Sequence, residues 1–366
     1  MFYRLHTDGT RQDVDLGNML TGPLRTACWI VGGGPSLSEL PHESIARSPA
    51  AKLAINLGGA RLIRPTLWTS YDPTARFHRS VYLDASIWKF VHARRAMDLV
   101  PETTFKVCEC PGVVFFDREP QRGFADFLPA QPAGVVDWND SFVQAIEIAY
   151  RLGFRMLYLA GCDFHVRPSS AQRVRAQAAG VEYASRELLG EFFDRCAAKG
   201  ISRDEIERLE PPTQYHFDER KPLAAAIQTD LHYFRVSQYL RLCRRALSLA
   251  GIELVSVTPE SRLNDYFRSV AAADAIEEIG ASVGNPAAEP TRGLYTQVQS
   301  RQPAGLGPMR DLKPHHWKAK GQPGGDDKPP AARSSSQDRS RAAVKQRVMA
   351  AIDRVPETPV HINEEG

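Results

Sequence analysis

The chain of 366 residues lacks any apolar run of about eighteen residues, the length that a transmembrane helix needs. Its N-terminus, MFYRLHTDGTRQDVD, also lacks the continuous apolar segment of a secretory signal peptide. Hydrophobic residues make up 43% of the chain, which is typical of globular proteins. Together these features predict a cytoplasmic protein without a membrane span.

Cysteine is scarce, and its spacing fits neither a disulfide framework nor a zinc site. The six cysteines are scattered, and only Cys108 and Cys110 lie close together, two residues apart. Zinc knuckles use wider pairs, and no second pair completes a ligand set. We therefore expect reduced, mostly buried thiols. The histidines have no metal-ligand spacing either, so no metal site is predicted from spacing.

Charge of one sign is concentrated only near the C-terminus. Residues 281–347 carry twelve Lys and Arg against five Asp and Glu, whereas the whole chain has a net charge of only +3. The first 280 residues are therefore close to neutral, which argues against a nucleic-acid-binding body. Residues 281–366 are rich in Gly, Pro, Ser and Gln. This composition predicts a mostly disordered basic tail, in which 340–355 has the spacing of one short amphipathic helix.

Between residues 27 and 280, short apolar runs alternate with helix-like segments. Alternating strands and helices indicate parallel βαβ units. We predict an α/β fold: a Rossmann-like, doubly wound, mostly parallel sheet with a helical lid inserted at 165–228 and an N-terminal extension at 1–26. The predicted strands are 29–31, 52–57, 67–72, 88–92, 105–108, 156–160 and 252–257, and the main helices are 140–152, 230–250 and one that begins within 259–267.

The stretch CWIVGGGPSL at 28–37 places three glycines between an apolar strand and an expected helix start. Backbone N–H groups at such a turn bind phosphate, and Pro35 suits the first helical position. The stretch is not a P-loop, because no Gly-Lys-Ser/Thr follows, and Leu37 stands where the dinucleotide fingerprint has its third glycine. A plain tight turn is the alternative. The expected phosphate-binding residues are Gly32, Gly33, Gly34 and Ser36.

Polar residues also follow the other predicted strands. Asn56, Asp72 and Asp163 stand at strand ends, where parallel sheets bind their ligands. Ser141 begins the helix at 140–152, which Asn139 or Asp140 caps. His232 stands near the start of another helix and is the candidate general base. Each residue also has a purely structural interpretation: it can stabilise a turn, cap a helix or loop, or, for His232, pack as a structural histidine.

The predicted lid carries further polar candidates. His165, His216 and Asp218 lie within 165–228. They either face a substrate or belong to a solvated loop.

Several stretches together resemble the bacterial sialyltransferases of the Campylobacter type. The resemblance spans about 28 to 270 through short motifs whose order is distinctive. The chain also resembles the related MptE-like group, whose named member is a 6-hydroxymethylpterin diphosphokinase. The motifs are GGGPSL at 32–37, SFVQAIEIAYRLGFRMLYLAGCDF at 141–164, HYF at 232–234 and IELVSVTPESRLNDYF at 252–267.

The sialyltransferase resemblance implies an inverting, metal-independent glycosyltransferase that needs no cofactor. Its partners are a nucleotide-sugar donor and a hydroxyl acceptor, and His232 removes the acceptor proton. The sequence leaves a homo-oligomer open. The implied catalytic residues are His232 and Asp163, and the implied nucleotide-binding residues are Gly32, Gly33, Gly34, Ser36, Asn56, Asp72, Ser141 and Tyr233.

The chain departs from the sialyltransferases at three positions. Gly33 and Asp72 stand where that family has Asn, and Trp138 takes the place of a substrate-binding Arg. The Asp-Pro at 72–73 is closer to the MptE-like group, in which Asp72 and Asp163 would hold Mg²⁺ and ATP. A Mg²⁺- and ATP-dependent diphosphokinase is therefore the alternative function. A non-catalytic nucleotide-binding or scaffold protein is the third.

Overall fold

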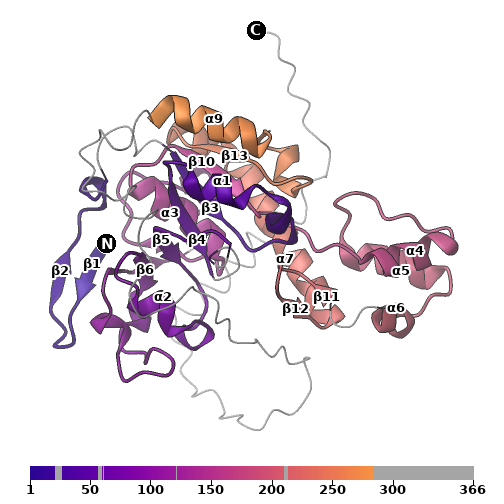
Figure 1. The fold of residues 1–366 in the computed structure, drawn as a ribbon, viewed down its shortest axis with the longest axis horizontal. Helices are drawn as coiled ribbons and strands as arrows, with labels where there is room; N and C mark the ends of the chain where they lie inside the picture. Colours follow the sequence, from indigo (N-terminus) through magenta and orange to yellow (C-terminus); the bar gives the residue numbers. More distant parts are fainter. Residues whose placement is uncertain (21–26, 57–59, 61, 121, 210–212, 284–366) are drawn as a thin grey trace.

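The computed structural model describes residues 1–20, 27–56, 60, 62–120, 122–209 and 213–283. Within them, a ten-stranded sheet forms the centre of the molecule (Figure 1). Neighbouring strands from β14 to β7 are all parallel, whereas β1 is antiparallel to both β7 and β2. The predicted α/β fold with a mostly parallel sheet is therefore confirmed. The strand order is β14 (Arg268–Ser269), β13 (Glu253–Ser256), β10 (Met156–Ala160), β3 (Ala27–Val31), β4 (Ala51–Ile55), β5 (Leu67–Thr69), β6 (Trp88–His92), β7 (Val113–Phe116), β1 (Phe2–Leu5) and β2 (Arg11–Asp13).

The direction in which the chain adds strands changes beside β3. After β3 the chain builds β4, β5, β6 and β7 outward on one side, and then returns to place β10, β13 and β14 on the other side. β3 and β10 pair in parallel from Ala27 with Met156 to Val31 with Ala160. Residues beyond the carboxyl ends of two such strands border a crevice, which is where parallel sheets bind ligands.

Buried parallel strands read as continuous apolar runs, and this is why most of the strands were predictable. The strands at 88–92 and 156–160 match the prediction to the residue. The strand predicted at 105–108 is wrong: 3-10 helix η6 (Val107–Glu109) lies there, and Phe105 is exposed. The strand is instead β7, where VVFF is buried between β6 and β1.

The helix predicted at 140–152 is confirmed as α3 (Ser141–Arg151), and Asp140 caps it. Two other helix starts differ from the prediction. The helix predicted from 230 begins earlier, as α7 (Leu223–Leu242), because Pro222 provides a natural first-turn boundary, and α8 (Arg244–Leu249) follows it. Pro35 begins only a short 3-10 helix, η3 (Pro35–Glu39), before α1 (His42–Arg47). The remaining elements around the sheet are α2 (Arg79–Leu83), α9 (Ala272–Val283), β8 (Arg118–Glu119), β9 (Val135–Val136) and the 3-10 helices η1 (Leu16–Asn18), η4 (Thr74–Arg76), η5 (Ala93–Arg95), η7 (Phe124–Asp126) and η8 (Arg262–Asp265).

The chain between β10 and α7 forms a helical segment beside the sheet. It contains α4 (Ser170–Ala178), α5 (Leu189–Ala198) and α6 (Arg203–Leu209), followed by the hairpin of β11 (Thr213–Gln214) and β12 (Arg220–Lys221). Figure 1 shows the three helices projecting from the body, with the hairpin close to α7. The helical segment has an apolar cluster of its own, which includes the buried side chains of Leu189, Phe192, Phe193 and Ile206.

No helix of the described residues is long and apolar enough to cross a membrane. All six cysteines lie in the described part of the chain and are free thiols, five of them buried. The predicted tail and its helix at 340–355 lie outside the described residues, except for residues 281–283 at the end of α9.

A buried ion pair joins α7 to η8 and to the helical segment. Asp230 and Arg262 lie 3.0 Å apart, with side chains 1% and 5% exposed. The Asp230 carboxylate also accepts the backbone N–H groups of Val166 and Leu189, each at 2.8 Å. This carboxylate therefore holds both the start of the helical segment and the start of α5.

We predict that Asp230→Ala lowers the free energy of unfolding by about 3–5 kcal/mol, because it leaves a buried guanidinium unpaired. Urea denaturation followed by circular dichroism measures the change. Glu277→Ala, at an exposed position on α9, is the control and should change stability by less than about 0.5 kcal/mol. Equal effects of the two variants would contradict the assigned role.

Candidate functional site

A cavity of about 600 Å³ lies beyond the carboxyl ends of β3, β4 and β10. The start of α3, the β11–β12 hairpin and α7 complete its wall. Nine of the ten predicted site residues line it, although they come from distant parts of the sequence. Ser36 is the exception. The nine are Gly32, Gly33, Gly34, Asn56, Asp72, Ser141, Asp163, His232 and Tyr233.

Two of the three glycines have a packing role. The N–H of Gly32 donates to the Ala160 carbonyl and the N–H of Gly34 to the Gly161 carbonyl, both at 2.8 Å. A Cβ atom at Gly32 would lie 2.5 Å from the Gly161 oxygen, and one at Gly34 would lie 1.8 Å from Asp163 Oδ2. The prediction that this turn offers its amides to a phosphate is therefore narrowed to Gly33, whose N–H has no acceptor among the described residues.

Ser36 and Asp163 form a hydrogen bond between the same two turns, the one after β3 and the one after β10. The Ser36 hydroxyl donates to Asp163 Oδ2 at 2.7 Å, and both side chains are buried. Burial raises the pKa of Asp163 to about 6, although hydrogen bonds from Ser36 and the charge of Arg167 act in the opposite direction. Ser36 thus contacts a carboxylate rather than the cavity, and Asp163 joins the turns that follow β3 and β10.

The carboxamide of Asn56 has a fixed orientation. Its Oδ1 lies 2.5 Å from the Ser70 hydroxyl and 3.2 Å from the Ser141 hydroxyl. Each hydroxyl accepts a backbone N–H, from Asp72 and Tyr71 respectively, and so directs its own proton to Asn56. The Asn56 NH₂ group has no acceptor among the described residues and can donate to a ligand. Ser141, predicted to meet a phosphate, uses its hydroxyl in this arrangement.

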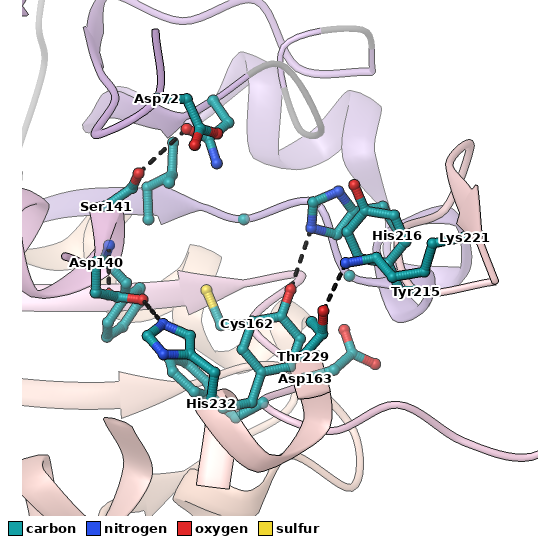
Figure 2. A pocket seen from close by; sticks show the side chains of 18 of the residues that line it. Asp72, Asp140, Ser141, Cys162, Asp163, Tyr215, His216, Lys221, Thr229 and His232 are labelled. Carbon is teal, nitrogen blue, oxygen red and sulfur yellow. Dashed lines mark hydrogen bonds and ion pairs between the residues drawn. The ribbon is translucent and has the colours of Figure 1, made fainter. Parts of the chain in front are cut away.

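His232 pairs with the residue that caps α3. One oxygen of Asp140 accepts the N–H groups of Phe142 and Val143, and the other lies 2.9 Å from His232 Nε2. Figure 2 shows this pair on the cavity wall. The Asp140 side chain is 10% exposed and that of His232 is 37% exposed. When Nε2 carries the proton donated to Asp140, Nδ1 is left as an acceptor, which is the form a general base needs.

The placement of His232 corrects one prediction and adds a residue. His232 lies in the middle of α7, not near a helix start. Sequence reasoning gave Asp140 only a capping role, because its second oxygen meets a residue 92 positions away. The Asn-Asp-Ser sequence at 139–141 signals the cap but not the partner.

The β11–β12 hairpin supplies a polar wall that the sequence did not reveal in full. Lys221 Nζ lies 2.6 Å from the Thr229 hydroxyl and 3.4 Å from the centre of the Tyr215 ring. Burial lowers the pKa of Lys221 to about 7, and the charge of Arg76 acts in the same direction. His216 also lines the cavity. Strands of two residues have no apolar period, so only the polar letters YHFDERK marked this segment.

The other two polar candidates of the predicted lid differ from each other. His165 lines the cavity and is buried, with its Nδ1 2.9 Å from the Asp163 carbonyl oxygen. Burial lowers the pKa of His165 to about 3, so the ring is neutral at physiological pH. Asp218 is half-buried and is not among the residues that line the cavity.

The two carboxylates proposed to hold Mg²⁺ have separate partners. Asp72 accepts from Arg76 at 2.5 Å, whereas Asp163 accepts from Ser36. Figure 2 shows Asp72 and Asp163 on different sides of the cavity. In the described part of the chain, no group of three or more His, Cys, Asp and Glu side chains is placed to hold a metal ion. Each of these contacts occupies one carboxylate oxygen, Oδ2 of Asp72 and Oδ2 of Asp163.

Comparison of the chain with protein-family models, with curated proteins and with solved structures finds no match. The resemblance to sialyltransferases and to the MptE-like group therefore stays a prediction from the motifs.

We predict that Gly34→Ala lowers the free energy of unfolding by about 1–3 kcal/mol, because the new methyl group overlaps the Asp163 carboxylate. Gly280→Ala is the matched control. Apart from its own helix backbone and chain neighbours, no atom of the described residues lies within 4 Å of a Cβ there, so helix propensity should stabilise the protein by up to about 1 kcal/mol. Urea denaturation of both variants checks the difference, and a stable Gly34→Ala protein would contradict the close packing.

The raised pKa of Asp163 predicts a pH-dependent stability difference. The folded state binds this proton more tightly than the unfolded state, so Asp163 costs stability as pH rises from about 4 to 6. We expect Asp163→Asn to gain about 2 kcal/mol relative to the unmodified chain between pH 4 and pH 7. Parallel denaturation curves at these two pH values measure the difference. A constant difference would show that the carboxylate is not perturbed.

Proposed function

We propose that this chain is a nucleotide-dependent group transferase, most specifically an inverting, metal-independent glycosyltransferase on a Rossmann-like, doubly wound sheet. The observation that carries the proposal is the His232–Asp140 pair at 2.9 Å, on the wall of a cavity that Gly33 and Asn56 also line. An oriented imidazole and unused hydrogen-bond donors share one cavity. General-base transfer from a nucleotide donor needs both.

In the proposed reaction, the acceptor hydroxyl lies against His232 Nδ1. The imidazole takes the hydroxyl proton while the acceptor oxygen attacks the anomeric carbon of the donor sugar. The bond from that carbon to the phosphate oxygen breaks, and its electron pair leaves with the nucleotide. Asp140 holds the imidazole orientation and stabilises the imidazolium that forms. A single displacement of this kind inverts the anomeric centre.

The donor nucleotide has two direct contacts in this proposal. The Gly33 N–H donates to a phosphate oxygen, and the Asn56 NH₂ donates to the ribose or the base. Both residues follow neighbouring strands, β3 and β4, so one nucleotide can reach both. The helical segment 165–209 and the hairpin would act as the lid, with the hairpin supplying the cavity wall.

The alternative functions make different demands on the same residues. A Mg²⁺- and ATP-dependent diphosphokinase needs the carboxylates of Asp72 and Asp163, which are bound to Arg76 and Ser36. A scaffold protein gives the His232–Asp140 pair no chemical role. The glycosyltransferase is the function that uses the contacts as they stand.

We predict that one class of nucleotide stabilises the protein. A ligand that binds the folded state and is present at 100 times its Kd adds about 2.7 kcal/mol to the free energy of unfolding. Thermal shifts with CMP, UDP, GDP and ATP, with and without Mg²⁺, identify the class. Nucleotide release from the corresponding sugar donors then tests transfer, with water as the fallback acceptor. EDTA should leave this release nearly intact, whereas it would abolish ATP cleavage by a diphosphokinase. No shift with any nucleotide would overturn both enzyme proposals.

Variants of the base pair test the mechanism. His232→Ala should lower kcat about 10²–10⁴-fold with little change in the nucleotide thermal shift. Asp140→Asn keeps a good helix cap but removes the charge beside the imidazole, so it should lower kcat without unfolding α3. His6→Ala, at an exposed position after β1, is the control. Unchanged turnover in His232→Ala would rule out the proposed base.

A further inference from the structure

His216 lines the same cavity from the hairpin and forms a second imidazole–carboxylate pair. His216 lies between β11 and β12, and its Nδ1 is 3.0 Å from Glu219 Oε2. The two side chains are 13% and 20% exposed. Figure 2 shows His216 on the opposite side of the cavity from His232. The cavity therefore has one histidine on each of two walls, each held by its own carboxylate.

Glu219 is held as a carboxylate by several donors. The Tyr215 hydroxyl donates to the same Oε2, and an Arg76 nitrogen lies 3.4 Å from it. Burial alone would raise the pKa of Glu219, but the hydrogen bonds from His216 and Tyr215 and the charge of Arg76 together lower it to about 2. The Glu219 carboxylate accepts the hydrogen bond of a protonated Nδ1 and so fixes the orientation of the His216 ring.

The other nitrogen of His216 reaches a tyrosine on α7. Nε2 lies 3.3 Å from the hydroxyl of Tyr233, which also lines the cavity and directly follows His232 in sequence. Burial raises the pKa of Tyr233 well above its ordinary value, and the nearby carboxylates of Asp140 and Asp163 act in the same direction. The phenol therefore stays neutral and can pass a proton on without ionising. Glu219, His216 and Tyr233 form a continuous chain that ends in the cavity.

An aromatic ring and two basic side chains also lie near the His216–Glu219 pair. Its ring stacks on Tyr215 at 4.1 Å, and Lys221 Nζ lies 3.4 Å from the centre of the same tyrosine ring. Burial lowers the pKa of Lys221 to about 7, which reduces its repulsion of an imidazolium. Arg76 is cationic, but the carboxylate of Asp72 pairs with it at 2.5 Å.

We propose that His216 is the general-acid partner of His232 and delivers a proton through Tyr233 to the leaving oxygen of the donor. This inference rests on the proposed transferase function and names its second acid–base group. Glu219 is a positioning residue that orients His216.

The His216 imidazolium gives its Nε2 proton to the Tyr233 oxygen while the Tyr233 hydroxyl proton moves to the leaving phosphate oxygen. The bond between that oxygen and the sugar carbon breaks, and the electron pair stays on the oxygen. His216 ends neutral, with its Nδ1 proton still on the Glu219 contact, and His232 ends protonated by the acceptor. Exchange with solvent restores both histidines.

The test is the pH profile of donor turnover in His216→Gln and Tyr233→Phe, with His232→Ala and His6→Gln measured in parallel. A required general acid makes the rate fall as pH rises through its pKa, which gives the profile a basic limb. We expect His216→Gln and Tyr233→Phe to lose this limb and to lower kcat about 10–10³-fold. The decrease in kcat should be larger for donors whose leaving group is more basic. His232→Ala should lose the acidic limb instead, and His6→Gln should keep both.

Nucleotide binding separates the two levels of the proposal. His216→Gln that retains the nucleotide thermal shift is folded and binds donor, so its pH profile is decisive. A basic limb that persists in this variant overturns the role of His216 while the transferase proposal stands. If the unmodified chain binds nucleotide but turns over no donor, the transferase proposal fails and the acid role fails with it. If Glu219→Asp retains the basic limb and Glu219→Gln loses it, the carboxylate of Glu219 positions His216.

Discussion

The close backbone contact between the turns after β3 and β10 is the constraint on which the cavity depends. Two glycine amides donate to the carbonyls of Ala160 and Gly161, and side chains at Gly32 or Gly34 would prevent this approach. The contact occurs where the chain reverses the direction in which it adds strands. Glycine at these positions is therefore explained by packing alone. Of the three glycine N–H groups, that of Gly33 alone has no acceptor among the described residues, so side chains would supply the rest of the proposed phosphate site.

The candidate site is built from contacts between distant elements rather than from one local motif. Asp140 uses one oxygen to cap α3 and the other to hold His232 on α7. The same carboxylate thus fixes a helix start and the orientation of an imidazole. The Asn56 amide is fixed in a similar way, by the hydroxyls of Ser70, which follows β5, and Ser141, at the start of α3.

The central strands of the sheet and the position of the candidate site were easier to predict from the sequence than the side-chain contacts within that site. Runs such as MLYLA are readable because both faces of a parallel strand are buried, and a polar residue at the end of such a strand falls at the ligand edge. The start of α7 was missed because its first half, LAAAIQTDL, has no clear apolar face. The pairing of Asp140 with His232 and that of His216 with Glu219 were missed for another reason: these contacts are set by tertiary structure, and neither local period nor spacing encodes them.

The hairpin and the glycine turn are physically linked, and this gives the two proposals a common basis. The Gly33 carbonyl accepts the Phe217 N–H at 3.0 Å, next to His216 in sequence. Gly33 therefore contacts the hairpin through its carbonyl, while its N–H, which has no acceptor among the described residues, is the proposed phosphate donor. A phosphate bound at that N–H would contact Gly33, the residue whose carbonyl accepts the hydrogen bond from Phe217, next to His216. Under the two proposals, donor binding and the position of His216 would be coupled through one residue, because a shift of Gly33 would move the Phe217 hydrogen bond.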